Sequence, residues 1–278
     1  MSIRSHFIPA SLAILMAAIA GPSYALEFPQ TRDRGAPARG PSLATRGEIC
    51  LDPQNRPSLT SLLPHNAIAT AFGNDTDIPM ALWFYVPETS ATSAELTIVS
   101  ELGDELYQRT IALPDTPGTI QIDLPRHQVD GVTPAFESGQ LYFWDFALIC
   151  DPDDRGDDIL LGGGIQRLDA SPDFLAQLDG VADDPLAQAE LYASAGVWQE
   201  TIALAANLRP QNPKAWTELL SSVDLAAIAE KPIVGQSRSL VDIPTPVPTA
   251  PNANATTPND DDSGNLQRLL EGINYRAE

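Results

Sequence analysis

The sequence of 278 residues is poor in lysine, in cysteine and in long apolar runs. It has 16 Lys and Arg residues, of which only Lys214 and Lys231 are lysines, against 37 Asp and Glu residues, for a net charge of −21. A surface this acidic repels the phosphates of nucleic acids and of anionic lipids, which argues against nucleic-acid binding. No apolar run reaches the roughly 20 residues that a membrane-spanning helix needs, so we do not expect an integral membrane protein.

The N-terminal segment 1–25 has the pattern of a secretory signal peptide. Arg4 precedes an apolar run at 12–20, and small residues lead up to Ala25. This order is typical of a signal peptide, and we expect cleavage after Ala25. Because the cleaved segment carries one arginine and no carboxylate, the mature chain has a net charge of −22. The sequence therefore predicts an exported protein, either periplasmic or extracellular.

The chain contains two cysteines, Cys50 and Cys150. In an exported protein two cysteines are more often paired than free. Cys50 lies just before the first candidate strand and Cys150 ends the densest aromatic run, so a bridge between them would join the two ends of one domain. Two buried free thiols are the alternative. Closing a loop of about 100 residues would stabilise the fold by about 4 to 5 kcal/mol in the loop-closure model.

Extended segments separated by Gly, Pro, Asn and Asp residues occupy the region 49–170, which is typical of an all-β domain. The candidate strands are 67–72, 80–86, 95–101, 106–113, 119–124, 141–150 and 159–168. Seven strands with this spacing predict an immunoglobulin-like antiparallel β-sandwich. Three consecutive glycines, 162–164, interrupt the last candidate strand and predict either a bulge or a closely packed backbone there.

The apolar spacing becomes helical in the region 171–231. Ser171 and Asp184 each stand before a proline, a combination typical of a helix start. The segment 191–220 resembles a tetratricopeptide unit, with Gly196 at the turn between its two helices. Because so few units do not form a stable solenoid by themselves, we expect 171–231 to be a helical annex that packs on the sandwich. The predicted fold is thus mainly β with a helical annex.

Two segments of low complexity flank these regions. The segment 26–48 is rich in Arg, Gly and Pro and predicts a leader without regular structure, either flexible or lying along the acidic body. The segment 232–262 is rich in Pro, Thr and Asn and predicts a disordered, extended linker.

The C-terminal segment 263–278 predicts a short amphipathic helix. Its apolar residues recur at helical spacing and form one stripe, Leu266, Leu269, Leu270 and Ile273. A helix this short is marginal in water unless its apolar face is buried. We expect the stripe to bind a partner protein, with docking on the chain's own helical annex and disorder as the alternatives.

With these features the chain resembles the family of exported, mainly cyanobacterial proteins known as DUF928. The matching stretches are RGAPARG at 34–40, TRGEIC at 45–50, LTSLLP at 59–64, LWFYVP at 82–87, QIDLP at 121–125, YFWDFALIC at 142–150 and LYASAGVW at 191–198. They follow one another in the order found in the family. The resemblance implies export, a cysteine pair and a β region followed by helices, and it implies no established activity.

Candidates for metal or proton chemistry are few. His65 and His127 lie in polar, turn-like settings, and no nucleophile motif, metal-ligand spacing or phosphate loop accompanies them, so we expect surface histidines. A run of aspartates is the best candidate for calcium binding: Asp151, Asp153, Asp154, Asp157 and Asp158. Arg155 within this run and Gly162 at the place of the closing glutamate depart from the calcium-loop pattern. A solvated acidic loop is therefore the preferred interpretation.

Three functions remain open. The leading prediction is an exported, non-catalytic protein-interaction or envelope-associated module without a cofactor, because a sandwich with a repeat-like annex offers a recognition surface. A ligand, calcium or glycan binder is the first alternative; sugars would stack on aromatic rings, although core positions are favoured for Trp83, Tyr85, Trp144 and Trp198. A hydrolase with two facing carboxylates is the second alternative, with candidates Glu95, Glu101 and Asp145.

Overall fold

The computed structural model describes residues 25–29, 50–52, 54, 56–64, 68–72, 78, 80–125, 136–236 and 240–242. The chain divides into two units, Met1–Ile243 and Pro244–Glu278, and all described residues belong to the first. Outside the described residues lie the signal peptide before Ala25, most of the leader and linker, His65, His127, and the stripe Leu266, Leu269, Leu270 and Ile273. The helices of the described part are all too short or too polar to cross a membrane.

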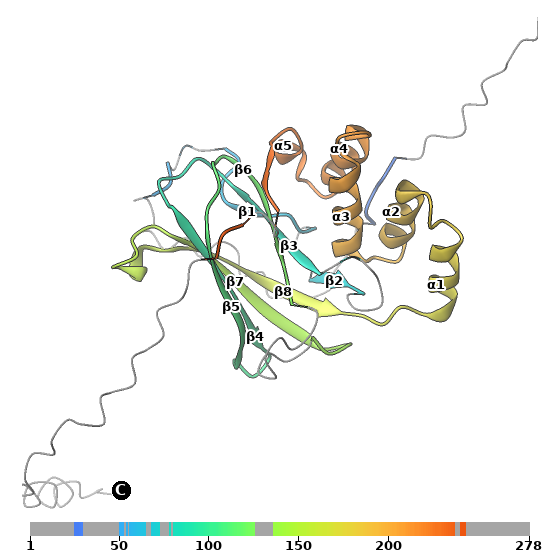
Figure 1. The fold of residues 1–278 in the computed structure, drawn as a ribbon, viewed down its shortest axis with the longest axis horizontal. Coiled ribbons are helices and arrows are strands. Elements are labelled where there is room, and N and C mark those ends of the chain that lie inside the picture. The colour runs from blue at the N-terminus through green and yellow to red at the C-terminus, as the bar shows by residue number, and fades with distance from the viewer. Residues whose placement is uncertain are drawn as a thin grey trace, which may run out of the picture. The chain divides into compact units, whose positions relative to one another are not determined.

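Two mixed β-sheets pack face to face (Figure 1). The four-stranded sheet has the order β1 (Thr60–Ser61), β3 (Ala81–Val86), β6 (Gly118–Asp123) and β9 (Ile233–Gly235). The five-stranded sheet has the order β2 (Ala69–Ala71), β8 (Ile159–Arg167), β7 (Leu141–Ile149), β4 (Ser93–Ser100) and β5 (Glu105–Ala112). The seven expected strands are present, each with ends within two residues of those expected.

The prediction that every strand pair is antiparallel is wrong for two pairs. β2 pairs with β8, and β6 pairs with β9, in parallel. Both β2 and β9 are edge strands of three residues. A strand this short carries too little alternation to fix its direction from sequence, since direction depends on the connections that bring it to the sheet.

β3 is buried on both faces, which explains its unbroken apolar sequence ALWFYV. Leu82, Phe84 and Val86 enter the core between the two sheets, where Phe84 stacks on Phe146 with ring centroids 4.1 Å apart. The alternate side chains of β3 enter a second apolar core on the opposite side, shared with the helices. The structure therefore has three layers, two sheets and a layer of helices.

The helical layer covers the outer face of the four-stranded sheet (Figure 1). It consists of α1 (Pro172–Asp179), α2 (Pro185–Ser194), α3 (Trp198–Leu208), α4 (Pro213–Ser222) and α5 (Ala226–Ala229). Ser171 and Asp184 accept hydrogen bonds from the first-turn amides of α1 and α2, as their position before proline predicts. Trp83 of β3 meets Trp216 of α4 with ring centroids 6.2 Å apart.

Buried hydrogen bonds join the helices to β2. The N-cap residue of α3 is Val197, whose side chain cannot accept a hydrogen bond from the first-turn amides. Thr70 of β2 takes this role, because its Oγ1 accepts from Trp198 N at 3.1 Å. The same hydroxyl donates to Gly196 O at 2.7 Å. Glu200, which is 1% exposed, accepts from Phe72 N at 2.8 Å. The first turn of α3 is thus completed by a strand about 128 residues earlier in the chain.

The segment 232–242 differs from the expected unpacked linker. Ile233–Gly235 form β9 beside β6, and Leu240 is 8% exposed in the core between the sheets. Farther on, Ala112 N donates to Val241 O and Asp242 pairs with Arg109 at 2.6 Å. The segment therefore crosses from the edge of one sheet to the edge of the other. The prolines that dominate the composition of 232–262 lie mostly beyond residue 243. The composition of the whole segment therefore gives no sign of the short apolar run Ile233–Gly235.

The three glycines of β8 form no bulge. β7 and β8 pair without a break from Leu141 opposite Gln166 to Leu148 opposite Ile159. A side chain at Gly163 would overlap the indole of Trp144, whose Nε1 donates to Gly164 O at 3.2 Å. Of the two expectations for 162–164, the closely packed backbone matches the structure and the bulge does not.

Cys50 and Cys150 form a disulfide with a Cα–Cα separation of 5.3 Å. We expect intact mass spectrometry of the protein to show a gain of two hydrogens on reduction. Replacing both cysteines by serine should lower the free energy of unfolding by about 4 kcal/mol, because a loop of 100 residues is no longer closed in the unfolded chain. Two free thiols in protein taken from its native compartment would contradict this expectation.

Gly196 has a φ of 71° at the turn between α2 and α3. We expect Gly196→Val to lower the free energy of unfolding by about 1 to 3 kcal/mol, because a β-branched residue is strained in the left-handed region. Gly196→Asn is the matched control, since asparagine tolerates this conformation. Thermal unfolding of both variants measures the difference, and equal midpoints would show that the turn does not require the left-handed backbone.

Candidate functional site

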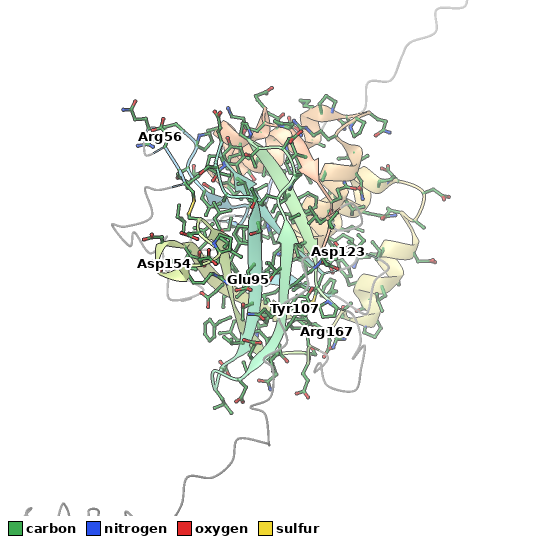
Figure 2. The ribbon with its side chains drawn as sticks, turned by 60° about the vertical axis from the view of Figure 1, so that its left-hand side comes forward. Arg56, Glu95, Tyr107, Asp123, Asp154 and Arg167 are labelled. Carbon is green, nitrogen blue, oxygen red and sulfur yellow. A yellow bond between two sulfur atoms is a disulfide. The ribbon has the colours of Figure 1, made fainter. Side chains whose placement is uncertain are left out.

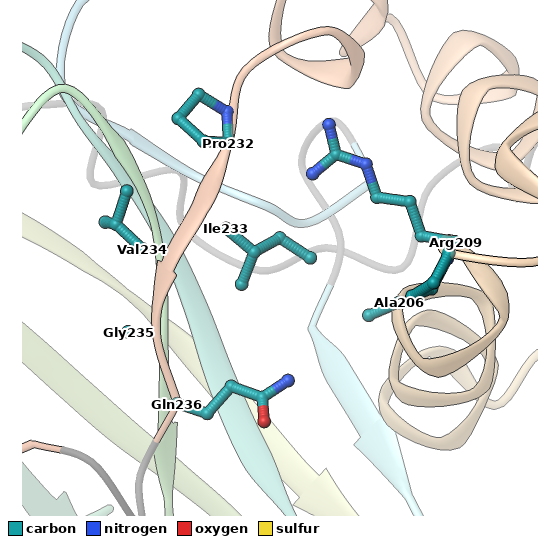
Figure 3. Close-up of a pocket in the computed structure, with 8 residues that line it drawn as sticks. Ala206, Arg209, Pro232, Ile233, Val234, Gly235 and Gln236 are labelled. Atoms are coloured by element: carbon teal, nitrogen blue, oxygen red, sulfur yellow. The ribbon is translucent and has the colours of Figure 1, made fainter.

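An open groove lies between β9 and the C-terminal end of α3 (Figure 3). We call it the β9 groove. Its volume of about 670 Å³ is within the usual range of ligand sites. Most of the residues that line it are apolar, and two, Arg209 and Gln236, have polar side chains. The apolar lining residues are Ala206, Pro210, Pro232, Ile233, Val234 and Gly235. Figure 3 shows Ile233 of β9, and Gln236 directly after β9, extending toward the end of α3, where Ala206 and Arg209 lie.

The backbone of β9 offers hydrogen-bonding groups on its open side. Thr119 of β6 is in register with Ile233, and Thr119 N donates to Pro232 O at 2.8 Å. In a parallel pair this pattern directs the N–H and C=O of Ile233 away from β6. β9 is the last strand of its sheet among the described residues. An edge strand of this kind is a template for pairing with another extended chain.

Arg209 provides a fixed positive charge at the groove. Its Nη2 donates to Ala229 O at 3.2 Å and to Lys231 O at 2.8 Å, and its guanidinium lies 5.7 Å from the ring centroid of Trp216. These contacts hold the planar group in place, while Nε and Nη1 have no hydrogen-bond partner among the described residues. A guanidinium held in this way is suited to binding a carboxylate.

The aspartate run closes on itself and on an arginine (Figure 2). Asp151 accepts from Asp153 N, and Asp154 accepts from Gly156 N to cap the 3₁₀ turn η3 (Arg155–Asp157). Arg155 pairs with Asp158 at 2.6 Å and with Glu95 of β4 at 2.9 Å. Within the described ranges, no group of three His, Cys, Asp or Glu side chains is arranged to hold a metal ion. The run acts as a set of local caps around an ion pair.

The three hydrolase candidates do not form a facing pair of carboxylates. Glu95 and Asp145 lie on the same face of β4 and β7, at diagonal positions. Both oxygens of Glu95 are engaged, Oε1 by Arg155 and Oε2 by the hydroxyl of Thr110. Glu101 is exposed in the turn after β4. Glu95 therefore serves an ion-pair network with Arg155 and Asp158.

The four aromatic residues considered for sugar stacking are buried. Trp83 and Tyr85 are each 2% exposed, Trp144 is 1% exposed and Trp198 is 0% exposed. Trp144 and Trp198 also donate their indole N–H to backbone oxygens inside the protein. Stacking on a sugar needs an accessible ring face, so these residues belong to the core, which the sequence favoured.

Sequence reasoning missed a cluster that holds the end of 232–242 in place. Arg109 of β5 pairs with Asp242, and Tyr107 lies on the same strand (Figure 2). Burial raises the pKa of the Tyr107 hydroxyl above its usual range, so this hydroxyl stays neutral at physiological pH. Nothing in the sequence signals this cluster, because Arg109 and Asp242 are 133 residues apart.

The sequence also missed the β9 groove. Arg209 was part of the expected annex, and Ile233 was part of the expected linker. Only the parallel pairing of β9 with β6 brings them to one site. The one signal that could have indicated it is the short apolar run Ile233–Gly235 directly after the helical region.

Comparison with known proteins gives a family. No curated protein and no solved structure matches the chain. The sequence model of the family described as Domain of Unknown Function (DUF928) matches residues 41–233, which is more than half of the chain and includes both sheets up to β9 and all five helices. The chain therefore belongs to the DUF928 family, as its motifs predicted.

Proposed function

We propose that this protein is an exported, non-catalytic module that binds an extended segment of a partner protein along the open edge of β9. The outward direction of the N–H and C=O of Ile233 carries the proposal. A segment added beside β9 would form main-chain hydrogen bonds there and place alternate side chains against the apolar wall. Ala206, Pro210 and Ile233 supply that wall.

The charge at the groove indicates the chemistry of the partner segment. Arg209 contributes a held guanidinium to a chain whose net charge is −21. A segment with an acidic side chain beside its apolar residues would pair with Nε or Nη1 of Arg209. The partner is therefore a protein segment that is apolar and acidic, in the periplasm or outside the cell.

Export and architecture complete the proposal. The signal-like segment 1–25 and the disulfide Cys50–Cys150 support export. The paired sheets would serve as an immunoglobulin-like scaffold. α2, α3 and α4 would form a tetratricopeptide-like unit, which the turn at Gly196 supports. The tail 263–278 would be a second contact for a partner, carried by a tether that begins after residue 242.

Ile233 allows a matched test. Ile233→Pro removes the outward-facing N–H and leaves the β9 hydrogen bonds to β6 intact, since proline is tolerated at an open edge. Ile233→Ala is the control, because it removes the same side chain and keeps the N–H. We expect a displayed library of ten-residue peptides to yield apolar, acidic binders of the native chain. Ile233→Pro should weaken them about tenfold relative to Ile233→Ala, as expected for the loss of one hydrogen bond.

The same selection can refute the proposal. A library that yields no binder to the native chain would count against a peptide site. Binders that bind the proline and alanine variants equally would show that the edge of β9 takes no part. Circular dichroism of both variants serves as the folding control.

A further inference from the structure

The segment 26–29 runs beside α2, α3 and α4 (Figure 1). It forms one wall of a second groove, whose other lining residues come from α2 and α4. Leu26 is 1% exposed and Phe28 is 5% exposed, whereas Ala25 and Glu27 are exposed. The ring of Phe28 meets Trp198 edge to face, with centroids 5.0 Å apart. The first residues of the expected leader are therefore part of the annex core.

Two helix side chains of α4 hold the backbone of this segment. Leu26 N donates to Glu218 Oε2 at 3.3 Å, and Phe28 N donates to Ser222 Oγ at 3.0 Å. The other oxygen of Glu218 pairs with Lys214 at 2.9 Å. The side chain of Lys214 is 63% exposed and that of Glu218 only 23%, so solvent screens the lysine more than the carboxylate.

We propose that this groove is a binding site for a free α-amino group on Leu26. The peptide bond between Ala25 and Leu26 is hydrolysed by an export peptidase. Water supplies its oxygen to the carbonyl carbon of Ala25, which becomes a carboxylate, and both of its protons to the nitrogen of Leu26, which becomes an ammonium. The resulting α-ammonium lies where Leu26 N lies now and forms an ion pair with Glu218. This site is separate from the β9 groove and does not depend on the function proposed for it.

The position of the cut agrees with the local structure. The scissile bond lies at the boundary between the exposed Ala25 and the buried Leu26, and the sequence pattern independently predicts cleavage at this bond. One amide N–H can form one hydrogen bond, whereas an ammonium has three donors and a full charge. Further acceptors line the groove beside Glu218, namely Glu190, Ser194 and Ser221.

Cleavage after Ala25 changes the contacts that the N-terminal segment forms with α4. The apolar contacts of Leu26 and Phe28 are available to the cut and to the uncut chain. The ion pair with Glu218 is available only to the cut chain, because an amide carries no charge. Processing therefore adds an ion pair between the N-terminus and α4.

The test compares full-length mature chains that differ by one residue. One chain begins at Leu26 and the other at Ala25, each produced with a native N-terminus, and each is also made with Glu218→Gln. At pH 6.5 we expect the chain that begins at Leu26 to melt about 2 to 4 °C higher. The difference should vanish in the Glu218→Gln pair.

The pH dependence gives a second readout. An ion pair raises the pKa of an α-ammonium above its usual range of about 7.7 to 8.0. Its contribution is full below the unfolded pKa and is lost as the pH rises through the folded pKa. The difference between the two chains should thus disappear by about pH 10. Equal midpoints at pH 6.5, a difference that survives Glu218→Gln, or an exported protein whose first residue is not Leu26 would each overturn the proposal.

Discussion

The side chains of β3 point alternately into two different apolar cores, and the rest of the structure depends on this division. Leu82, Phe84 and Val86 complete the core between the sheets, while Trp83 and Tyr85 complete the core beneath the helices. Each large side chain buried in this way contributes about 1.5 to 3 kcal/mol. Separation of either the helical layer or the five-stranded sheet would expose one apolar face of β3 to water. The annex is thus a structural layer of the domain.

The order of elements along the chain explains where the candidate site lies. β9 follows the five helices, so it joins the four-stranded sheet at the free side of β6 and faces the end of α3. The chain then crosses to β5, where Arg109 holds Asp242. The pairing with β6 therefore holds β9 itself, and the ion pair holds the chain at residue 242. The proposed recognition of an extended chain rests on three features of this site: the open edge of β9, an apolar surface and the guanidinium of Arg209.

The sequence was informative where the pattern is long and local. Apolar runs bounded by turn residues at 80–86 and 141–150 predicted β3 and β7, and Ser171 and Asp184 predicted helix starts, because each of these signals lies within one element. β1 and β9 were missed because two or three residues carry no measurable period. The β9 groove was missed for a different reason. Its two sides are 22 or more residues apart in sequence, and only the parallel register of β9 with Thr119 aligns them. The fit of Gly163 under Trp144 likewise required the register of β7 with β8.

We infer that β3 joins the helices and the two sheets into one cooperative folding unit. Native-state hydrogen exchange in low concentrations of denaturant, with the disulfide intact, tests it most directly. If β3 couples the layers, the most protected amides of α3 and of β7 exchange through the same global opening, with equal free energies and equal dependence on denaturant. If the amides of α3 exchange at a clearly lower opening free energy while β7 stays protected, the helices unfold independently of the sheets. That result would contradict the coupling through β3.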